Sequence, residues 1–170
     1  LFIVFLLLAI PFKSYYQPLI VMFAIPYGII GAVIGHVLLG MDFSILSMLG
    51  IAALSGVVVN DSLVMMDYIN RNKERTGNYI QAAISAGPMR FRAILLTSLT
   101  TFIGVMPLIF ERSIQAKFLV PMAVSLGFGV LFSTFVTLIL VPTTYITFEK
   151  IKEYLLKKIK NQLYITNLHK

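Results

Sequence analysis

The chain has 170 residues, of which 58% are hydrophobic and only 12% are charged, and its formal net charge at pH 7 is +7. A soluble domain is typically about a quarter charged, so this composition excludes an ordinary soluble globular protein and indicates an integral membrane protein. The sequence has no cysteine, which excludes a disulfide framework and a thiolate metal site. The basic residues flank apolar runs, so we interpret them as topology signals and lipid contacts and expect no nucleic-acid binding.

The apolar runs predict a series of membrane helices. Residues 1–12 are apolar but shorter than the roughly 20 residues that span a bilayer, and we interpret them as a truncated transmembrane helix. Complete transmembrane helices are predicted at 18–39, 44–69, 90–110 and 119–148. The predicted fold is therefore all-α, a polytopic membrane helix bundle with the lipid bilayer as its surroundings.

The remaining segments predict loops and an orientation. Residues 71–89 are expected to form a loop with a short interfacial helix over 78–87, which Gly87-Pro88 ends. Residues 149–170 form a basic tail. Twelve of the 14 Lys and Arg residues lie in the Lys13 turn, in 71–92 and in the tail. The positive-inside rule therefore predicts that loop 71–89 and the tail are cytoplasmic.

Small residues in the first complete span predict close helix packing. Gly28, Gly31 and Gly35 lie three and four residues apart and form one stripe on a helix. Gly56, in the next span, is interpreted in the same way. Pro26 is expected to kink its helix, and a lone His36 is more often an interfacial or packed residue than a proton carrier.

Asn60 and Asp61 are the strongest functional signal, because they interrupt an apolar helix. An ionised Asp at the centre of a bilayer costs about 2.5–3.5 kcal/mol and by default marks an ion or substrate pathway. Asn60 shares a face with Asp67, while Asp61 points about 100° away. The pair could join helices by hydrogen bonds or line an ion-coupling centre, and we favour the coupling centre.

Arg90 and Thr97 lie seven residues apart at the start of the third complete span, so they share a helix face. They would offer a positive charge and a hydroxyl to a neighbouring carboxylate. The alternative is that Arg90 reaches lipid phosphates and that the hydroxyls bond to their own helix. No phosphate-binding loop, metal cluster or nucleophile triad is present in the sequence, so we expect a transporter that is not an enzyme and has no cofactor or metal site.

In this order, these segments resemble the C-terminal transmembrane part of the resistance-nodulation-division (RND) efflux pumps, the acriflavine-resistance multidrug transporters. The resemblance covers about Leu1 to Lys152 and would make the chain a truncated helix 8 followed by helices 9–12. The matching segments are the aromatic turn 12–18, the Pro-x-Gly-xx-Gly segment at 25–32, the helix 10 stretch 56–67, the helix 11 start at 90–98, Gly-Val-Met-Pro-Leu at 104–108, and Val141-Pro142.

The resemblance implies a proton-driven antiporter of the bacterial inner membrane that exports drugs or other xenobiotics. It implies a homotrimer that works with a periplasmic adaptor protein and an outer-membrane channel. Arg90 and Thr97 match the proton-relay positions of helix 11, and Asn60 matches the Asn of helix 10. The proton-relay candidates are therefore Asn60, Asp61, Arg90 and Thr97.

The chain departs from the best-known multidrug members at three positions. Val59 replaces a Lys that precedes the helix 10 Asn, and Ala93 replaces a common Pro. Asp61 occupies a position that is usually small or apolar, so the relay is expected to be wired differently here. Two other functions stay open: a heavy-metal exporter of the same superfamily, since methionine can bind Cu(I), and a non-transporting membrane scaffold.

Overall fold

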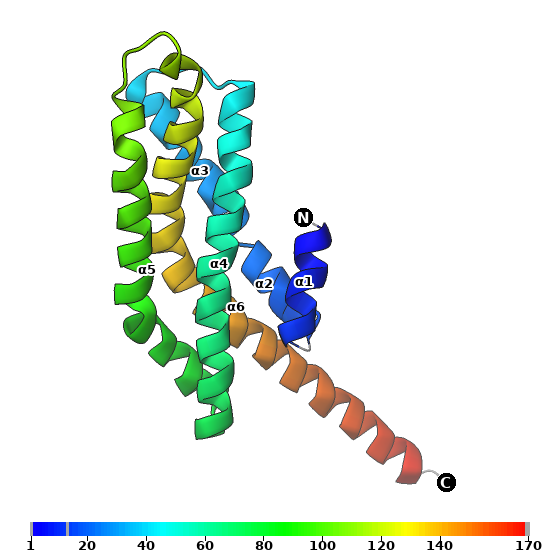
Figure 1. Cartoon of the computed structure of the whole chain (residues 1–170). Coiled ribbons are helices and arrows are strands. Elements are labelled where there is room, and N and C mark those ends of the chain that lie inside the picture. The colour runs from blue at the N-terminus through cyan, green and yellow to red at the C-terminus, as the bar shows by residue number, and fades with distance from the viewer. Residues whose placement is uncertain (1, 13, 169–170) are drawn as a thin grey trace.

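A computed structural model describes residues 2–12 and 14–168, and every regular element in these ranges is helical. The elements in chain order are α1 (Phe2–Phe12), α2 (Tyr16–Met22), α3 (Ile25–Leu39), α4 (Ile45–Thr76), α5 (Tyr79–Ile109), the short 3-10 helix η1 (Ala116–Phe118) and α6 (Val120–Leu168). By length and composition, the four segments Tyr16–Leu39, Ile45–Thr76, Tyr79–Ile109 and Val120–Lys158 can each cross a membrane. The predicted all-α membrane bundle is confirmed (Figure 1).

The first complete span is two helices, α2 and α3, instead of one kinked helix. Pro26 lies in the first turn of α3, where its ring nitrogen has no hydrogen to donate to the preceding turn. The chain therefore turns at Phe23 and Ala24, whose N–H groups donate to Leu19 O at 2.9 Å and Val21 O at 3.3 Å.

The loop expected at 71–89 is nearly absent, which corrects the sequence prediction. Helix α4 continues to Thr76 and ends at Gly77, whose φ of 66° is left-handed. Asn78 then caps α5, because its side-chain oxygen accepts from the N–H groups of Ile80 and Gln81 at 2.9 and 3.2 Å. No interfacial helix is needed to connect the two spans.

The predicted helix end at Gly87-Pro88 is also wrong, because α5 runs through Pro88 to Ile109. Ala82, Ala83 and Ala86 are fully buried; these small side chains pack the first turns of α5 into the core, and this packing outweighs the hydrogen bond that the proline lacks. Figure 1 shows the N-terminal part of α5 bent away from the rest of the helix. The segment 78–87 therefore belongs to the bundle.

Helix α6 is the central element, since it contacts α3, α4 and α5. It runs on past residue 148, where the last span was expected to end. Figure 1 shows its C-terminal part leaving the bundle at an angle. Residues 149–168 of the predicted basic tail are therefore a continuation of α6.

Glycines bring α3 and α6 into close contact. A Cβ atom at Gly35 would lie 2.5 Å from the Phe128 ring, and one at Gly31 would lie 2.9 Å from the Phe128 carbonyl oxygen. A Cβ at Gly28 would lie 3.1 Å from the side chain of Leu54 in α4. Gly56 differs: it is exposed, and no atom of the described chain lies within 4 Å of its Cβ position. The packing contact expected there is not made within this chain, because Gly56 faces away from the buried side of α4.

His36 is packed, as the sequence favoured. It is 3% exposed, and its two ring nitrogens lie 2.9 Å from the Ala32 carbonyl oxygen and 2.8 Å from Ser47 Oγ. Ser47 also belongs to the capping box that starts α4, together with Ser44. His36 therefore fastens the end of α3 to the beginning of α4.

Candidate functional site

The register of α4 against α6 locates the site along the bundle. Three contacts define this register: Gly50 with Ser125, Leu54 with Gly129, and Lys73 with Glu149. The residue numbers of the partners increase together along both helices, so α4 and α6 are parallel. The offset in residue number between paired residues stays nearly constant. Interpolation between these contacts places Asp61 at the level of Thr137.

Helix α5 runs antiparallel to α4. The Arg90 guanidinium lies 5.1 Å from the centre of the Tyr68 ring, and the Asn72 amide donates to Ser85 Oγ at 2.8 Å. Asp61 lies two turns before Tyr68 in α4, and Thr97 lies two turns after Arg90 in α5. Asp61 and Thr97 therefore lie at the same height in the bundle.

Asp61 faces the inside of the bundle at this level. It is 7% exposed and shares the buried side of α4 with Leu54, Val58 and Met65. Within the part of the chain that the structure describes, its carboxylate forms no ion pair and no hydrogen bond. A buried carboxylate without partners is costly when ionised, so this position favours binding of a proton.

Several hydroxyl groups lie at about the same height in the bundle as Asp61. The hydroxyls of Ser98 in α5 and Thr134 in α6 are hydrogen-bonded to each other, and each also lies within hydrogen-bond distance of a carbonyl oxygen of its own helix, so that one donates across and the other donates to its carbonyl. Ser62 is fully buried, and its Oγ has no hydrogen-bond partner among the described residues. We call this set the polar layer; it consists of Asp61, Ser62, Ser98, Thr134 and Thr137, all at most 7% exposed. Such hydroxyls can donate to a carboxylate or pass a proton along.

The other predicted relay residues do not enter the polar layer. Asn60 and Thr97 are exposed, and Thr97 Oγ1 donates to Ile94 O of its own helix at 2.8 Å. Arg90 lies two turns from Thr97, about 10.5 Å along the helix axis, with Nε buried and unbonded among the described residues. Of the four candidates, only Asp61 faces the interior of this bundle.

Sequence reasoning missed a second polar cluster, at the end of the bundle near Lys73. Glu149 of α6 is 5% exposed and accepts from Lys73 Nζ at 2.7 Å, from the Tyr16 hydroxyl at 2.8 Å and from the Tyr145 hydroxyl at 3.2 Å. The cluster joins α2, α4 and α6. One signal was available in the sequence: Tyr145 and Glu149 lie four residues apart, so they share a face.

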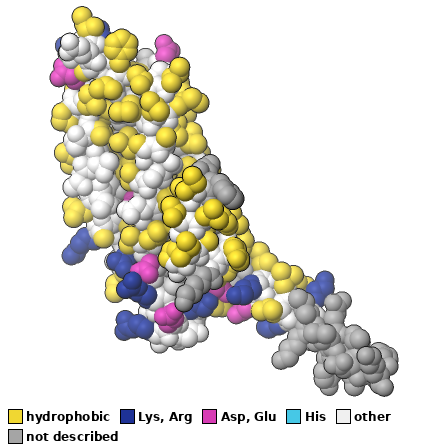
Figure 2. All heavy atoms as spheres, turned by 45° about the vertical axis from the view of Figure 1, so that its right-hand side comes forward, with side chains coloured by type: hydrophobic (Ala, Val, Ile, Leu, Met, Phe, Trp, Pro, Cys, Tyr) yellow, Lys and Arg dark blue, Asp and Glu magenta, His cyan; other side chains and the backbone are white. Residues whose placement is uncertain are grey.

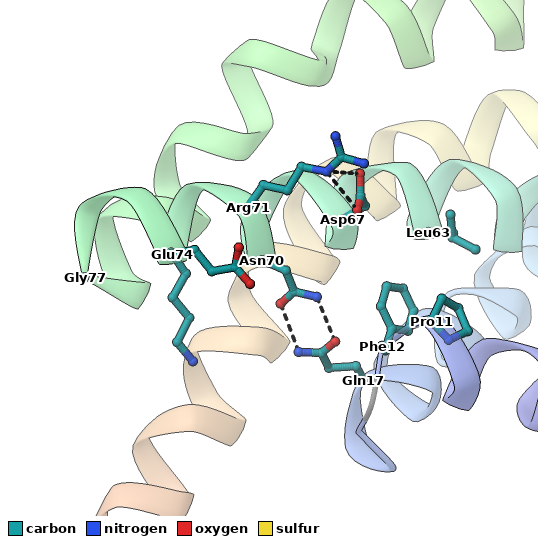
Figure 3. A pocket seen from close by; sticks show the side chains of 10 residues that line it. Pro11, Phe12, Gln17, Leu63, Asp67, Asn70, Arg71, Glu74 and Gly77 are labelled. Atoms are coloured by element: carbon teal, nitrogen blue, oxygen red, sulfur yellow. Dashed lines mark hydrogen bonds and ion pairs between the residues drawn. The ribbon is translucent and has the colours of Figure 1, made fainter.

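A groove of about 740 Å³ opens beside this cluster, between α4 and the turn that joins α1 to α2. In Figure 3 the amides of Gln17 and Asn70 face each other across it, and both of their hydrogen bonds are 2.9 Å long. Asp67 and Arg71 form an exposed ion pair at 3.0 Å on its rim. Asp67 and Arg71 already pair with each other, so the unpaired charge at this groove is that of Glu74, which lines it and forms no ion pair among the described residues.

Comparison with known proteins places this arrangement in a family. Residues 1–149 match the profile of the AcrB/AcrD/AcrF family. The chain belongs to the AcrB/AcrD/AcrF family. This assignment confirms the resemblance to RND permeases drawn from the sequence.

Relatives in this family are much longer than the chain. It is 30% identical over 153 residues to multidrug resistance protein MdtC of Photorhabdus laumondii, which covers 89% of this chain and 15% of that protein. The MdtC of Yersinia enterocolitica is 29% identical over 157 residues, covering 91% of this chain and 15% of the relative. A crystal structure of a heavy metal efflux pump superposes with a TM-score of 0.77 at 26% identity, covering 87% of this chain and 14% of the pump.

Proposed function

We propose that this chain is the membrane part of a proton-driven efflux transporter that exchanges protons for drugs or other xenobiotics. Membership of the AcrB/AcrD/AcrF family and the similarity to proteins named for multidrug resistance support this function. The observation that carries the proposal is the buried, unpartnered carboxylate of Asp61 within the polar layer.

The polar layer suits proton coupling because its stability depends on the charge of Asp61. An ionised Asp61 carries a charge in a low-dielectric interior, whereas the protonated carboxyl is neutral and can donate a hydrogen bond. The Ser62 hydroxyl has no partner among the described residues, so it would be available to the ionised form. Binding and release of a proton therefore change the preferred packing of α4 against α5 and α6, and such a change can drive alternating access.

Asn60 and Thr97 are proposed to act from the exposed faces of α4 and α5, and Arg90 from the contact between these helices, where its guanidinium lies 5.1 Å from the Tyr68 ring. Asn60 and Thr97 are exposed in this chain, so they are free to contact other helices of the complete transporter. Arg90 Nε is buried without a partner and can bind a carboxylate there. These three residues would tune the proton site, with Asp61 at its centre.

The proposed setting is the bacterial inner membrane, with the α4–α5 connection and the end of α6 in the cytoplasm. The lysines and arginines of 71–92 and of the tail support this orientation. By the family resemblance, the complete transporter is a homotrimer that works with a periplasmic adaptor and an outer-membrane channel. By the same resemblance, the drug-binding region would lie in other parts of the complete transporter.

Asp61→Asn in the complete transporter tests this proposal. The substitution keeps size and polarity but removes the titrating carboxyl. We expect substrate efflux from energised vesicles to lose its dependence on the proton gradient, with normal amounts of protein in the membrane. Asp67→Asn is the matched control, because Asp67 is an exposed residue on the same helix, and it should leave efflux unchanged. Unaltered efflux by Asp61→Asn at every pH would remove Asp61 from the coupling site.

A heavy-metal exporter is the second candidate, because the heavy metal efflux pump has a similar structure over 87% of the chain. The same vesicles, supplied with a lipophilic cationic dye or with Cu(I), distinguish the two substrates. The drug-export proposal predicts gradient-driven movement of the dye. A complex that moves neither, but whose assembly fails in Asp61→Asn, would indicate a membrane scaffold.

A further inference from the structure

Helix α6 is much longer than a membrane is thick. Its 49 residues, at 1.5 Å per residue, extend about 73 Å, whereas the hydrocarbon core of a bilayer is about 30 Å thick. The Glu149 cluster marks the polar end of the bundle, because it gathers a carboxylate, an ammonium and two phenol hydroxyls. We call residues 148–158 the α6 arm; it begins at this end and runs outward.

The α6 arm carries an exposed apolar ridge. Phe148, Ile151 and Leu155 lie at i, i+3 and i+7, so they form one stripe, and they are 42%, 51% and 51% exposed. Tyr154 and Leu156, on either side of the stripe, are 68% and 58% exposed. An apolar strip of this length on a helix outside the bundle marks an interaction surface.

The acidic and basic residues of the α6 arm differ in their partners. Its acidic residues, Glu149 and Glu153, lie one turn apart, and both are bound to the bundle: Glu149 to Lys73, Glu153 to the Tyr79 hydroxyl at 3.1 Å. All four lysines are exposed and are left to meet an external anion; they are Lys150, Lys152, Lys157 and Lys158. Figure 2 shows dark blue and yellow side chains side by side along this part of the molecule.

A small apolar groove lies where the arm leaves the bundle. It has a volume of about 300 Å³, and Tyr16, Phe148, Ile151, Leu155 and Leu156 line it together with Lys152. The Tyr16 and Phe148 rings stack at 6.3 Å, and Lys152 Nζ lies 5.7 Å from the centre of the Tyr16 ring. An apolar channel with an ammonium group beside it matches an acyl chain joined to an anionic headgroup.

We propose that the α6 arm docks on the anionic phospholipids of the adjacent leaflet. The arm lies along the headgroup layer, with Phe148, Ile151 and Leu155 toward the acyl chains and Lys152 and Lys158, which flank this stripe, toward the phosphates. This places α6, which supplies Thr134 and Thr137 to the polar layer, under the influence of lipid charge. The docking surface does not depend on proton coupling.

Because the sequence of this chain has no cysteine, spin labels can be attached to single cysteines introduced into it. Spin labels on Leu155→Cys and Lys157→Cys would be compared in nanodiscs of phosphatidylcholine with phosphatidylglycerol. We expect the label at 155 to be accessible to oxygen and protected from an aqueous nickel chelate, and the label at 157 to be open to the chelate. Phosphatidylcholine alone should increase the chelate accessibility of the label at 155.

Lysine variants test the role of charge. Each lysine near an anionic surface strengthens binding roughly fivefold, so Lys152→Gln with Lys158→Gln should lower the ratio of docked to free arm about 25-fold. Lys117→Gln, in the loop at the opposite end of the bundle, is the matched control and should change nothing.

Three results would overturn the proposal. Equal aqueous accessibility at 155 and 157 would mean that the arm projects into water. Protection at 155 that is the same without phosphatidylglycerol and in the lysine variants would mean apolar anchoring without selection of anionic lipid. Strong dipolar coupling between labels at 155 on two chains would mean that a second copy covers the ridge.

Discussion

Gly31→Ala tests the packing of α3 against α6, because the added methyl group has no room. Its Cβ would lie 2.5 Å from Phe132 Cβ, 2.9 Å from the Phe128 carbonyl oxygen and 3.1 Å from Gly129 Cα. Carbon atoms in contact are normally about 3.5–4.0 Å apart, so the shortest of these distances is about 1 Å too small. Two of the three opposing atoms are backbone atoms that cannot rotate away, so the two helices must separate.

The magnitude follows from two opposing effects. Overpacking of this kind costs about 1–3 kcal/mol, and replacing a helical glycine by alanine returns about 0.5–1 kcal/mol. We therefore expect Gly31→Ala to lower the free energy of unfolding by about 1 kcal/mol, within a range of about 0–2.5 kcal/mol. Gly56→Ala is the matched control: its Cβ position is open, so it should raise the free energy of unfolding of this chain by about 0.5–1 kcal/mol.

Reversible unfolding in mixed detergent micelles, followed by helical circular dichroism, measures both variants. The packing argument requires opposite signs for Gly31→Ala and Gly56→Ala. Equal stabilities for the two variants would refute the close approach of α3 to α6. Gly104→Ala, another open helical position, should behave like Gly56→Ala.

The Glu149 cluster and the helix caps give further predictions for the same unfolding assay. Lys73→Ala removes the cation that binds the buried Glu149 and should lower the free energy of unfolding by about 1–3 kcal/mol, whereas Arg71→Ala breaks only an exposed pair and should lower it by about 0.5 kcal/mol or less; equal effects would contradict the burial of the cluster. Ser44→Ala removes the capping box of α4 and should lower the free energy of unfolding by about 0.5–2 kcal/mol. Wild-type stability for Ser44→Ala would show that the cap contributes nothing.

The number of complete membrane spans and their helical type could be predicted from the sequence, because apolar runs report directly on membrane spans. Their ends could not. Pro26 and Pro88 are both prolines in apolar segments, yet the helix breaks before Pro26 and continues through Pro88. The difference depends on three buried alanines in α5 that pack against the bundle, which is tertiary information.

The site was predicted in part. The cost of a charge inside a membrane singled out Asp61, and the structure places it in the interior. The spacing from Arg90 and the family resemblance singled out Thr97, whereas its neighbour Ser98 is the hydroxyl that faces inward. The spacing of Ala86, Ile94 and Ser98 along one face of α5 was the available signal. The two-turn distance between Arg90 and the polar layer depends on the antiparallel register of α4 and α5, which the sequence alone does not specify.

Infrared difference spectroscopy of the complete transporter tests the central claim most directly. Spectra recorded on substrate addition would be compared for the wild type and Asp61→Asn. The account predicts a band from a protonated carboxyl group that changes with substrate in the wild type and is missing in Asp61→Asn. An unchanged carboxyl band in Asp61→Asn would show that Asp61 does not exchange a proton during transport.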